Sequence, residues 1–168
     1  FHKVILMSIN LARRSLFRRK EQDNIVRLPW LKADLDFTEE CTRCGDCKTA
    51  CPEQIIIIGD GGFPEIDFSV SECNFCKECV NHCKEDLFDL TQAQAWTNKA
   101  TVSNGCLNLE SVYCRSCSES CESEALAFNF TNTTFVSPDV VLNDCNGCGA
   151  CVSSCPVNAI AVTPNRLI

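Results

Sequence analysis

Sixteen cysteines in this 168-residue chain recur in short, regular groups. Thiolate sulfur is a soft ligand that proteins use for zinc and for iron–sulfur clusters. Three thiolates spaced by two residues can bind one face of a cubane 4Fe–4S cluster from a single tight loop. Two groups follow the pattern C-x2-C-x2-C-x3-C: Cys41, Cys44, Cys47 and Cys51, then Cys73, Cys76, Cys79 and Cys83. The spacing therefore predicts iron–sulfur chemistry.

Two other uses of cysteine fit this spacing less well. Structural zinc usually takes two C-x2-C pairs that are well separated in the sequence, without a third cysteine two residues further on. Disulfide scaffolds are typical of small secreted chains, and no segment here resembles a secretory signal. The ligand spacing favours iron–sulfur clusters over both.

The second half of the chain repeats the plan of the first. A third group is stretched to C-x7-C-x2-C-x3-C, and a fourth restores the tight spacing and ends in Pro156. The fourth cysteines lie 32 residues apart in the first half and 34 in the second, which indicates an internal duplication. The two groups are Cys106, Cys114, Cys117 and Cys121, then Cys145, Cys148, Cys151 and Cys155.

In bacterial two-cluster chains the fourth cysteine of each motif binds the cluster of the other motif. We therefore expect four 4Fe–4S clusters, each with one crossing ligand. The expected sets are Cys41, Cys44, Cys47 with Cys83; Cys73, Cys76, Cys79 with Cys51; Cys106, Cys114, Cys117 with Cys155; and Cys145, Cys148, Cys151 with Cys121.

Two residues leave alternatives open. Seven residues separate Cys106 from Cys114, so Cys106 is either a ligand or a free buried thiol beside a labile three-iron cluster. His82 adjoins a ligand cysteine and is interpreted as a surface neighbour, with a Rieske-type ligand as the alternative.

Short elements should connect the cysteine loops. After Cys51 the sequence predicts a helical turn, a strand over 55–58, a turn over 59–62 and a strand over 63–68. Strands are likewise expected over 125–130, 135–141 and 159–162. The fold class is α+β, with tandem bacterial-type two-cluster ferredoxin units. The expected divisions are a basic segment 1–32, a first unit 33–90, a connector 91–104 anchored by Trp96, and a second unit 105–168.

The charge of the chain is strongly asymmetric. Residues 1–32 hold eight Lys or Arg against two acids, a charge of +6, whereas residues 33–168 carry −13. An acidic body argues against nucleic acid as a partner, because phosphates require neutralisation by basic groups. No apolar run approaches the 18 or so residues of a membrane span. No glycine-rich nucleotide fingerprint or catalytic triad stands out, so an enzyme is not expected.

The basic segment contains Arg13, Arg14, Arg18 and Arg19, and its Arg-Arg-x-Leu-Phe run looks like a twin-arginine export motif. A functional export signal has an apolar stretch behind the arginines, whereas charged and polar residues follow here. A cytoplasmic location is therefore predicted. The four arginines are candidates for partner docking, with a solvated basic tail as the alternative. Met7 is the expected initiator.

Several of these features together resemble the NapF family, ferredoxin-type accessory proteins of the periplasmic nitrate reductase system. They are the Arg-Arg pairs of the basic segment, Pro29-Trp30, the CTRCGDC and CNFCKEC motifs, Gly61-Gly62-Phe63-Pro64, Ala95-Trp96, the stretched third motif, and CNGCGACVSSCPVNAI over residues 145–160. Lys84 and Glu122 depart from the proline expected after a fourth cysteine.

The resemblance implies a cytoplasmic iron–sulfur protein that meets the catalytic subunit of periplasmic nitrate reductase before export and assists its maturation. The assistance would consist of electron transfer or cluster assembly. A general electron carrier and an electron-transfer subunit of an oxidoreductase complex are the alternatives.

Overall fold

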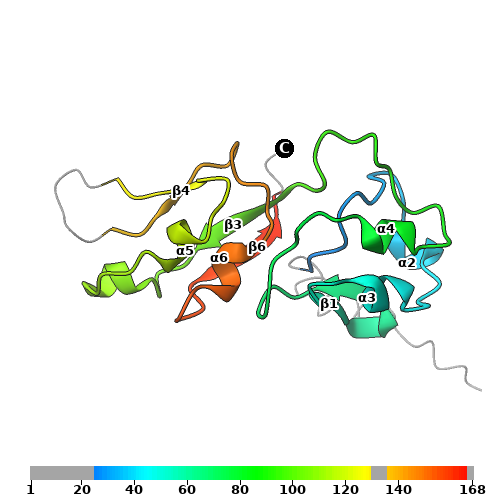
Figure 1. Ribbon diagram of the computed structural model, residues 1–168, viewed down its shortest axis with the longest axis horizontal. Coiled ribbons are helices and arrows are strands. Elements are labelled where there is room, and N and C mark those ends of the chain that lie inside the picture. Colours follow the sequence, from blue (N-terminus) through cyan, green and yellow to red (C-terminus); the bar gives the residue numbers. More distant parts are fainter. Residues whose placement is uncertain (1–24, 130–135, 166–168) are drawn as a thin grey trace, which may run out of the picture.

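The computed structural model describes residues 25–129 and 136–165. Its elements form two groups along the longest axis of the molecule, one from each half of the chain (Figure 1). The first group contains α2 (Phe37–Glu40), α3 (Asp46–Ala50), β1 (Ile56–Ile58), η1 (Asp60–Gly62), β2 (Pro64–Ile66) and α4 (Glu78–Asn81). The second contains β3 (Asn98–Val102), η2 (Leu107–Glu110), α5 (Ser116–Glu119), β4 (Leu126–Ala127), β5 (Asp139–Val140), α6 (Ala150–Ser153) and β6 (Ile160–Pro164). Short helices and small antiparallel sheets confirm the α+β class.

The first hairpin forms where the sequence predicted it. Strands β1 and β2 pair antiparallel, with Ile56 opposite Ile66 and Ile58 opposite Pro64. The turn between them uses Gly61 and Gly62 at φ 68° and 82°, backbone conformations that glycine adopts without steric cost. Its apolar side supports the loop after α3, because Ile55 and Ile56 are buried.

The hairpin of the second half is shorter than expected. Strands β4 and β5 pair over two residues each, Leu126 with Val140 and Ala127 with Asp139. Of the predicted strands 125–130 and 135–141, residues 130–135 lie outside the described part. Between Phe128 and Val140 the only fully buried residue among those described is Pro138, which cannot donate a backbone hydrogen bond to a longer ladder.

Part of the expected connector is a strand. Residues 98–102 form β3, which pairs antiparallel with β6 over five residues. Ala100 and Val162 face each other in this register, and both are buried. The segment between the two cysteine-rich halves therefore contributes directly to the sheet of the second half.

Small aliphatic side chains and thiols share the core. Buried positions include Ile55, Leu126 and Ile160 alongside Cys79, Cys117, Cys145 and Cys151. Because four cysteines are among the buried residues, we expect the stability of the core to depend on what the thiols bind. Within the described ranges, no helix combines the length and apolar character needed to cross a membrane.

An aromatic row lies where the two halves meet. The Phe75 ring packs on Trp30 at 6.0 Å and on Trp96 at 5.8 Å between centroids, and Trp96 packs on Phe68 at 6.0 Å. The Nε1–H of Trp96 also donates a hydrogen bond of 2.8 Å to the carbonyl of Asn146. Trp96 thus holds the fourth motif against the second.

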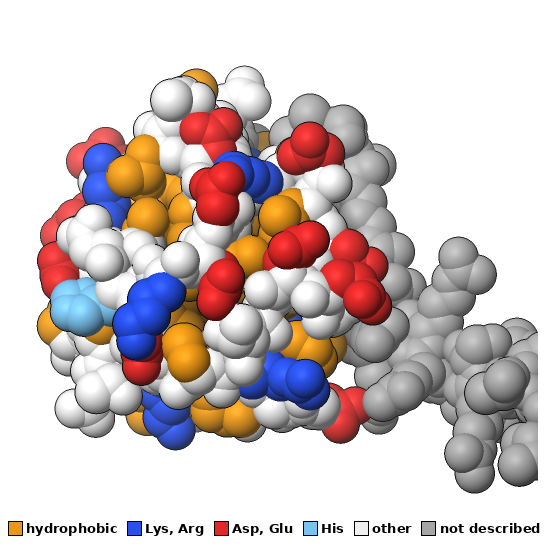
Figure 2. Space-filling model, turned by 90° about the vertical axis from the view of Figure 1, so that its right-hand side faces the viewer, with side chains coloured by type: hydrophobic (Ala, Val, Ile, Leu, Met, Phe, Trp, Pro, Cys, Tyr) orange, Lys and Arg blue, Asp and Glu red, His pale blue; other side chains and the backbone are white. Residues whose placement is uncertain are grey.

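The outer end of the first half carries a mixed but acid-rich surface. Glu39, Glu40, Glu85 and Asp86 are exposed, and carboxylates with interspersed Lys and Arg cover this end in Figure 2. The surface agrees with the negative charge predicted for the body of the chain.

Candidate metal centres

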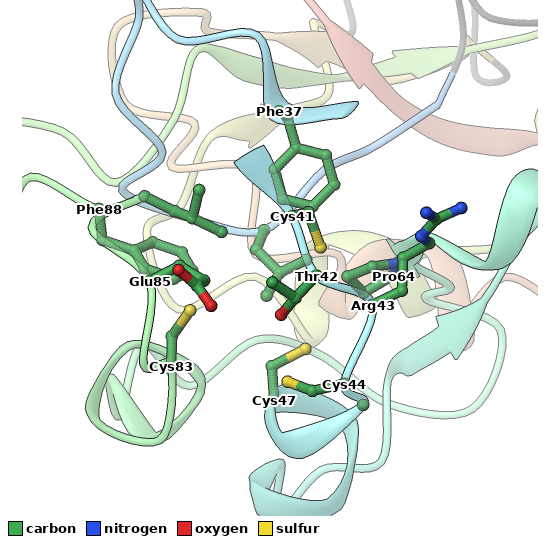
Figure 3. A pocket seen from close by; sticks show the side chains of 13 residues that line it. Phe37, Cys41, Thr42, Arg43, Cys44, Cys47, Pro64, Cys83, Glu85 and Phe88 are labelled. Carbon is green, nitrogen blue, oxygen red and sulfur yellow. The ribbon is translucent and has the colours of Figure 1, made fainter. Parts of the chain in front are cut away.

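Three sets of four cysteines line cavities in the structure, and the first of these cavities lies at the end of the first half. We call it cavity 1. Cys41, Cys44 and Cys47 come from the first motif, and Cys83 comes from the residues after α4 (Figure 3). Phe37, Leu28 and Phe88 supply apolar walls. Cys51, the fourth cysteine of the same motif, does not line this cavity.

Cavity 2 is the reciprocal site. The second motif provides Cys73, Cys76 and Cys79, and Cys51 completes the set. Trp30 and Ile55 are among the side chains that close it. Each cavity of the first half therefore combines three cysteines from one loop with one from the other.

Cavity 3 repeats this arrangement with the stretched third motif. Cys106, Cys114 and Cys117 line it together with Cys155. Cys106 thus faces the same space as the other three thiols, although seven residues separate it from Cys114. This position matches the interpretation of Cys106 as a ligand rather than as a detached thiol.

The expected fourth set is Cys145, Cys148, Cys151 and the crossing Cys121, and we call its expected site cavity 4. Burial is the main cause that raises the pKa of the Cys151 thiol to about 12, with smaller contributions from the nearby thiols of Cys148, Cys145, Cys121 and Cys117. Cys121 of the third motif therefore lies near the thiols of the fourth motif, as does Cys117 of cavity 3.

The short helices explain why the fourth cysteine crosses. Helix α3 begins after Gly45, whose φ of 81° turns the chain sharply, and it contains Cys47. The helix ends at Cys51, which returns to extended geometry at φ −74° and ψ 113°. One helical segment therefore presents Cys47 to cavity 1 and Cys51 to cavity 2. Helix α6 has the same left-handed glycine, Gly149, at its start.

Burial dominates the protonation of these thiols. It raises the pKa of Cys47, Cys73 and Cys117 to about 11 and that of Cys79 to about 12. Without a metal the thiols are therefore protonated at neutral pH. A metal must displace these protons because only thiolates are strong ligands, so falling pH opposes binding.

The sulfur atoms surround cavities instead of converging on a point. In residues 25–129 and 136–165, no three His, Cys, Asp or Glu side chains come together as a single-ion site requires. A cubane cluster is a larger body that takes one thiolate at each of four iron corners. Four thiols around a largely apolar cavity are the donor set that such a cluster takes.

Comparison with known proteins identifies the family. Residues 40–87 and 112–164 match the 4Fe-4S dicluster domain. The ferredoxin-type protein NapF of Escherichia coli is 40% identical over 156 residues, which cover 92% of this chain and 95% of that protein. NapF of Haemophilus influenzae is 39% identical over 165 residues, or 91% and 94% of the two chains. The chain belongs to the NapF family of ferredoxin-type proteins.

A more distant relative has the same general description. The methylamine utilization ferredoxin-type protein MauM of Methylobacillus flagellatus is 27% identical over 163 residues, 85% of this chain and 70% of that protein. The NapF-family chain is thus an iron–sulfur, ferredoxin-type protein with an electron-transfer character, and the resemblance drawn from its motifs is confirmed.

Asparagine side chains order the cysteine loops of this NapF-family chain. The Oδ1 atoms of Asn74 and Asn146 accept hydrogen bonds of 3.1 and 3.0 Å from the backbone N–H of Cys76 and Cys148. In the stretched motif, buried Asn108 does the same for Cys114 at 3.2 Å, and its Nδ2 donates to the Cys114 carbonyl at 2.7 Å. The helical turn η2 brings Asn108 into place, so the longer loop ends in the same local geometry.

Lys99 is a second functional candidate that the sequence analysis missed. Its side chain is buried, with 6% of the residue exposed, and its Nζ donates to the carbonyl oxygen of Cys145 at 2.5 Å. A buried ammonium beside a thiolate-bound cluster stabilises negative charge there. Its position on β3, opposite Thr163, could not be inferred without knowing that 98–102 is a strand.

Two remaining predictions concern residues outside the cavities. His82 is exposed, and its Nδ1 lies 3.0 Å from the Glu78 carbonyl oxygen on α4. It does not line cavity 1, in keeping with its interpretation as a surface neighbour. Arg13, Arg14, Arg18 and Arg19, and with them Met7, lie outside the described residues.

Proposed function

We propose that the chain binds four 4Fe–4S clusters through its sixteen cysteines, one cluster in each cavity with one crossing ligand. The observation that carries this proposal is the grouping of twelve thiols in three sets of four, each with three thiols from one loop and one from its partner loop. The fourth cluster follows from the same spacing of Cys145, Cys148 and Cys151 with Cys121. The dicluster family match over both halves supports the same type of cofactor. When bound, such clusters exchange single electrons.

Anaerobic reconstitution tests the cluster count. Protein saturated with iron and sulfide should contain about sixteen of each per chain, because each cubane holds four iron and four sulfide. A plateau near eight would contradict the assignment of clusters to the second half.

We further propose that the protein is not an enzyme but a cytoplasmic accessory protein. Its client is the catalytic subunit of periplasmic nitrate reductase, which it assists before export by electron transfer or cluster assembly. The support is the resemblance to NapF along nearly the whole chain, together with the basic segment, which a freely diffusing carrier does not need.

A capture experiment tests the partner. Full-length protein and a variant lacking residues 8–20 are each used to capture the catalytic subunit from extract. The full-length protein should retain it, and the deletion should weaken retention, because residues 8–20 hold the candidate docking arginines Arg13, Arg14, Arg18 and Arg19. The iron content of the client, measured with and without this protein, separates cluster assembly from electron supply. Detection of the mature protein in the periplasmic fraction would contradict the cytoplasmic location.

An electron-transfer subunit is the second candidate, and a relative that is 27% identical over 129 residues and is described as a subunit of an oxidoreductase complex favours it. A permanent subunit would elute from native extract as a stable complex of fixed stoichiometry in gel filtration. The accessory function predicts that most of the protein elutes on its own.

A further inference from the structure

The second and fourth cysteine loops contact each other directly where the two halves meet. The backbone N–H of Cys73 donates a hydrogen bond of 2.8 Å to the carbonyl oxygen of Cys148. Cys73 lines cavity 2, and Cys148 belongs to the set of cavity 4. A single hydrogen bond therefore joins residues of two cavities that lie in different halves of the chain.

Tight side-chain packing fixes this contact. The Phe68 ring lies against Gly149, so closely that an added Cβ would sit 2.1 Å from the ring carbon Cδ1. Trp96 contacts the Phe75 ring of the second motif and donates to Asn146 of the fourth. We call this contact region, formed by Phe68, Cys73, Trp96, Cys148 and Gly149, the junction.

We propose that the junction is an electron-transfer contact, which connects the four cavities in the order 1, 2, 4, 3. The two halves would then act as one continuous relay instead of two independent two-cluster carriers. This inference rests on the proposed binding of a cluster in each cavity.

The bonded route across the junction is short. From the Cys148 sulfur it follows that residue to its carbonyl oxygen, crosses one hydrogen bond to the Cys73 nitrogen, and ends at the Cys73 sulfur. One electron leaves the site on one side, which is oxidised, and one arrives on the other, which is reduced. No proton is transferred, and no covalent bond is made or broken. A low-potential one-electron reductant such as dithionite supplies the electron in vitro.

Cavities 1 and 3, the first and last in this order, lie in different surroundings. Cavity 1 reaches the surface through exposed Cys44. Beside cavity 3, the stretched loop exposes Leu109, Val112 and Tyr113, with 47%, 49% and 67% of each residue accessible. These ends belong to opposite halves of the elongated molecule (Figure 1). A continuous relay therefore gives the protein two separated surfaces for electron entry and exit.

The first test isolates the two inner sites. A Cys44→Ala, Cys114→Ala variant should lose the outer clusters and retain about eight iron per chain. After reduction with dithionite, the EPR signals of the two remaining centres in this variant should be split by spin–spin interaction. Eight iron with two unsplit, independent signals would overturn the junction while leaving cluster binding intact. Fewer than sixteen iron in the unaltered protein would instead count against the proposed function.

The intact protein provides a test that needs no variant. Dilute protein receives less than one electron per chain and is frozen at increasing times. A connected relay should collect the electrons on the one centre of highest potential, so that a single EPR signal remains. Two signals that persist, one from each half, would overturn the relay.

A matched pair of variants locates the contact in this second test. Trp96→Phe keeps an aromatic ring but cannot donate to Asn146, and it should slow the approach to a single signal. Tyr113→Phe likewise keeps an aromatic ring and loses a polar group, but Tyr113 is 67% exposed and lies outside the junction, so this variant should behave as the unaltered protein. Equal slowing of the approach to a single signal in both variants, or no slowing in either variant, would contradict a route through the junction.

Discussion

At the scale of single residues, the crossing cysteines make the sharpest prediction about the sites. Cys51 ends α3 and lines cavity 2, whereas its neighbours Cys44 and Cys47 line cavity 1. Replacing Cys51 with Ser should therefore perturb the centre of cavity 2 first. Spectroscopy that resolves the two centres of the first half is the measurement.

Cys44→Ser is the control for this prediction, because it should affect only the centre of cavity 1 directly. Cys51→Ser could instead remove the centre of the first loop and spare that of the second. Each motif would then bind its own cluster, and the crossing assignment would be wrong.

Lys99 makes a prediction about redox potential. Lys99→Gln removes a buried positive charge beside the Cys145 loop, so the reduced, more negative centre of cavity 4 loses stabilisation. Its midpoint potential should fall, by about 59 mV for each tenfold loss in the reduction equilibrium. An EPR-monitored redox titration measures the change.

Lys48→Gln is the matched control, because Lys48 is exposed and follows Cys47 of cavity 1. Solvent screens that charge, so its removal should shift the potential of the neighbouring centre much less. Equal shifts in the two variants would show that burial of Lys99 has no special electrostatic effect.

At the scale of elements, two glycines at equivalent motif positions separate backbone strain from packing. Gly45 and Gly149 each follow the second cysteine of a motif and precede a helix, at φ 81° and 90°. A Cβ at Gly45 would meet no atom within 4 Å, whereas at Gly149 it would collide with Phe68. Gly45→Ala should cost about 1–2 kcal/mol of unfolding free energy, from the left-handed backbone alone.

Gly149→Ala should cost clearly more than Gly45→Ala, because the Phe68 ring must move and the junction must open. Anaerobic denaturant titration of the cluster-loaded protein gives both free energies. A loss at Gly149 no larger than at Gly45 would mean that the two halves do not depend on this packing.

The element scale also shows what the sequence could and could not predict. Regular cysteine spacing predicted which thiols would line cavities 1, 2 and 3, because a tight loop and a one-turn helix leave the chain few alternatives. The strand at 98–102 was not predicted, since its partner β6 lies about 60 residues further on and local composition favoured neither strand nor loop. Lys99 was missed for the same reason, because its partner Cys145 lies 46 residues further on, whereas Asn108 bonds to Cys114 within its own stretched loop. Ligation by the sixteen cysteines stays a prediction.

At the scale of the whole molecule, cluster loss should unfold the protein. The core is thin in large apolar side chains and rich in buried thiols, and the proposed clusters cross-link loops about 32 residues apart. Anaerobic removal of iron by a chelator should therefore abolish the circular dichroism signal and the thermal unfolding transition of the native protein. A metal-free chain that keeps its cooperative transition would show that apolar packing alone sustains the fold.

The pairing of β3 with β6 also has a consequence for synthesis on the ribosome. Ribosomes add about 5–20 residues per second, so β3 emerges several seconds before the strand that covers its edge. Cys106 is likewise synthesised well before Cys155, the crossing ligand expected for its set. All eight cysteines of the first half, by contrast, are already present when residue 83 has been made. During that interval the nascent chain contains a completed first half, a strand β3 without its partner β6, and three thiols of the third motif without their crossing ligand. The second half is therefore the part of the newborn chain that is most dependent on a timely supply of iron.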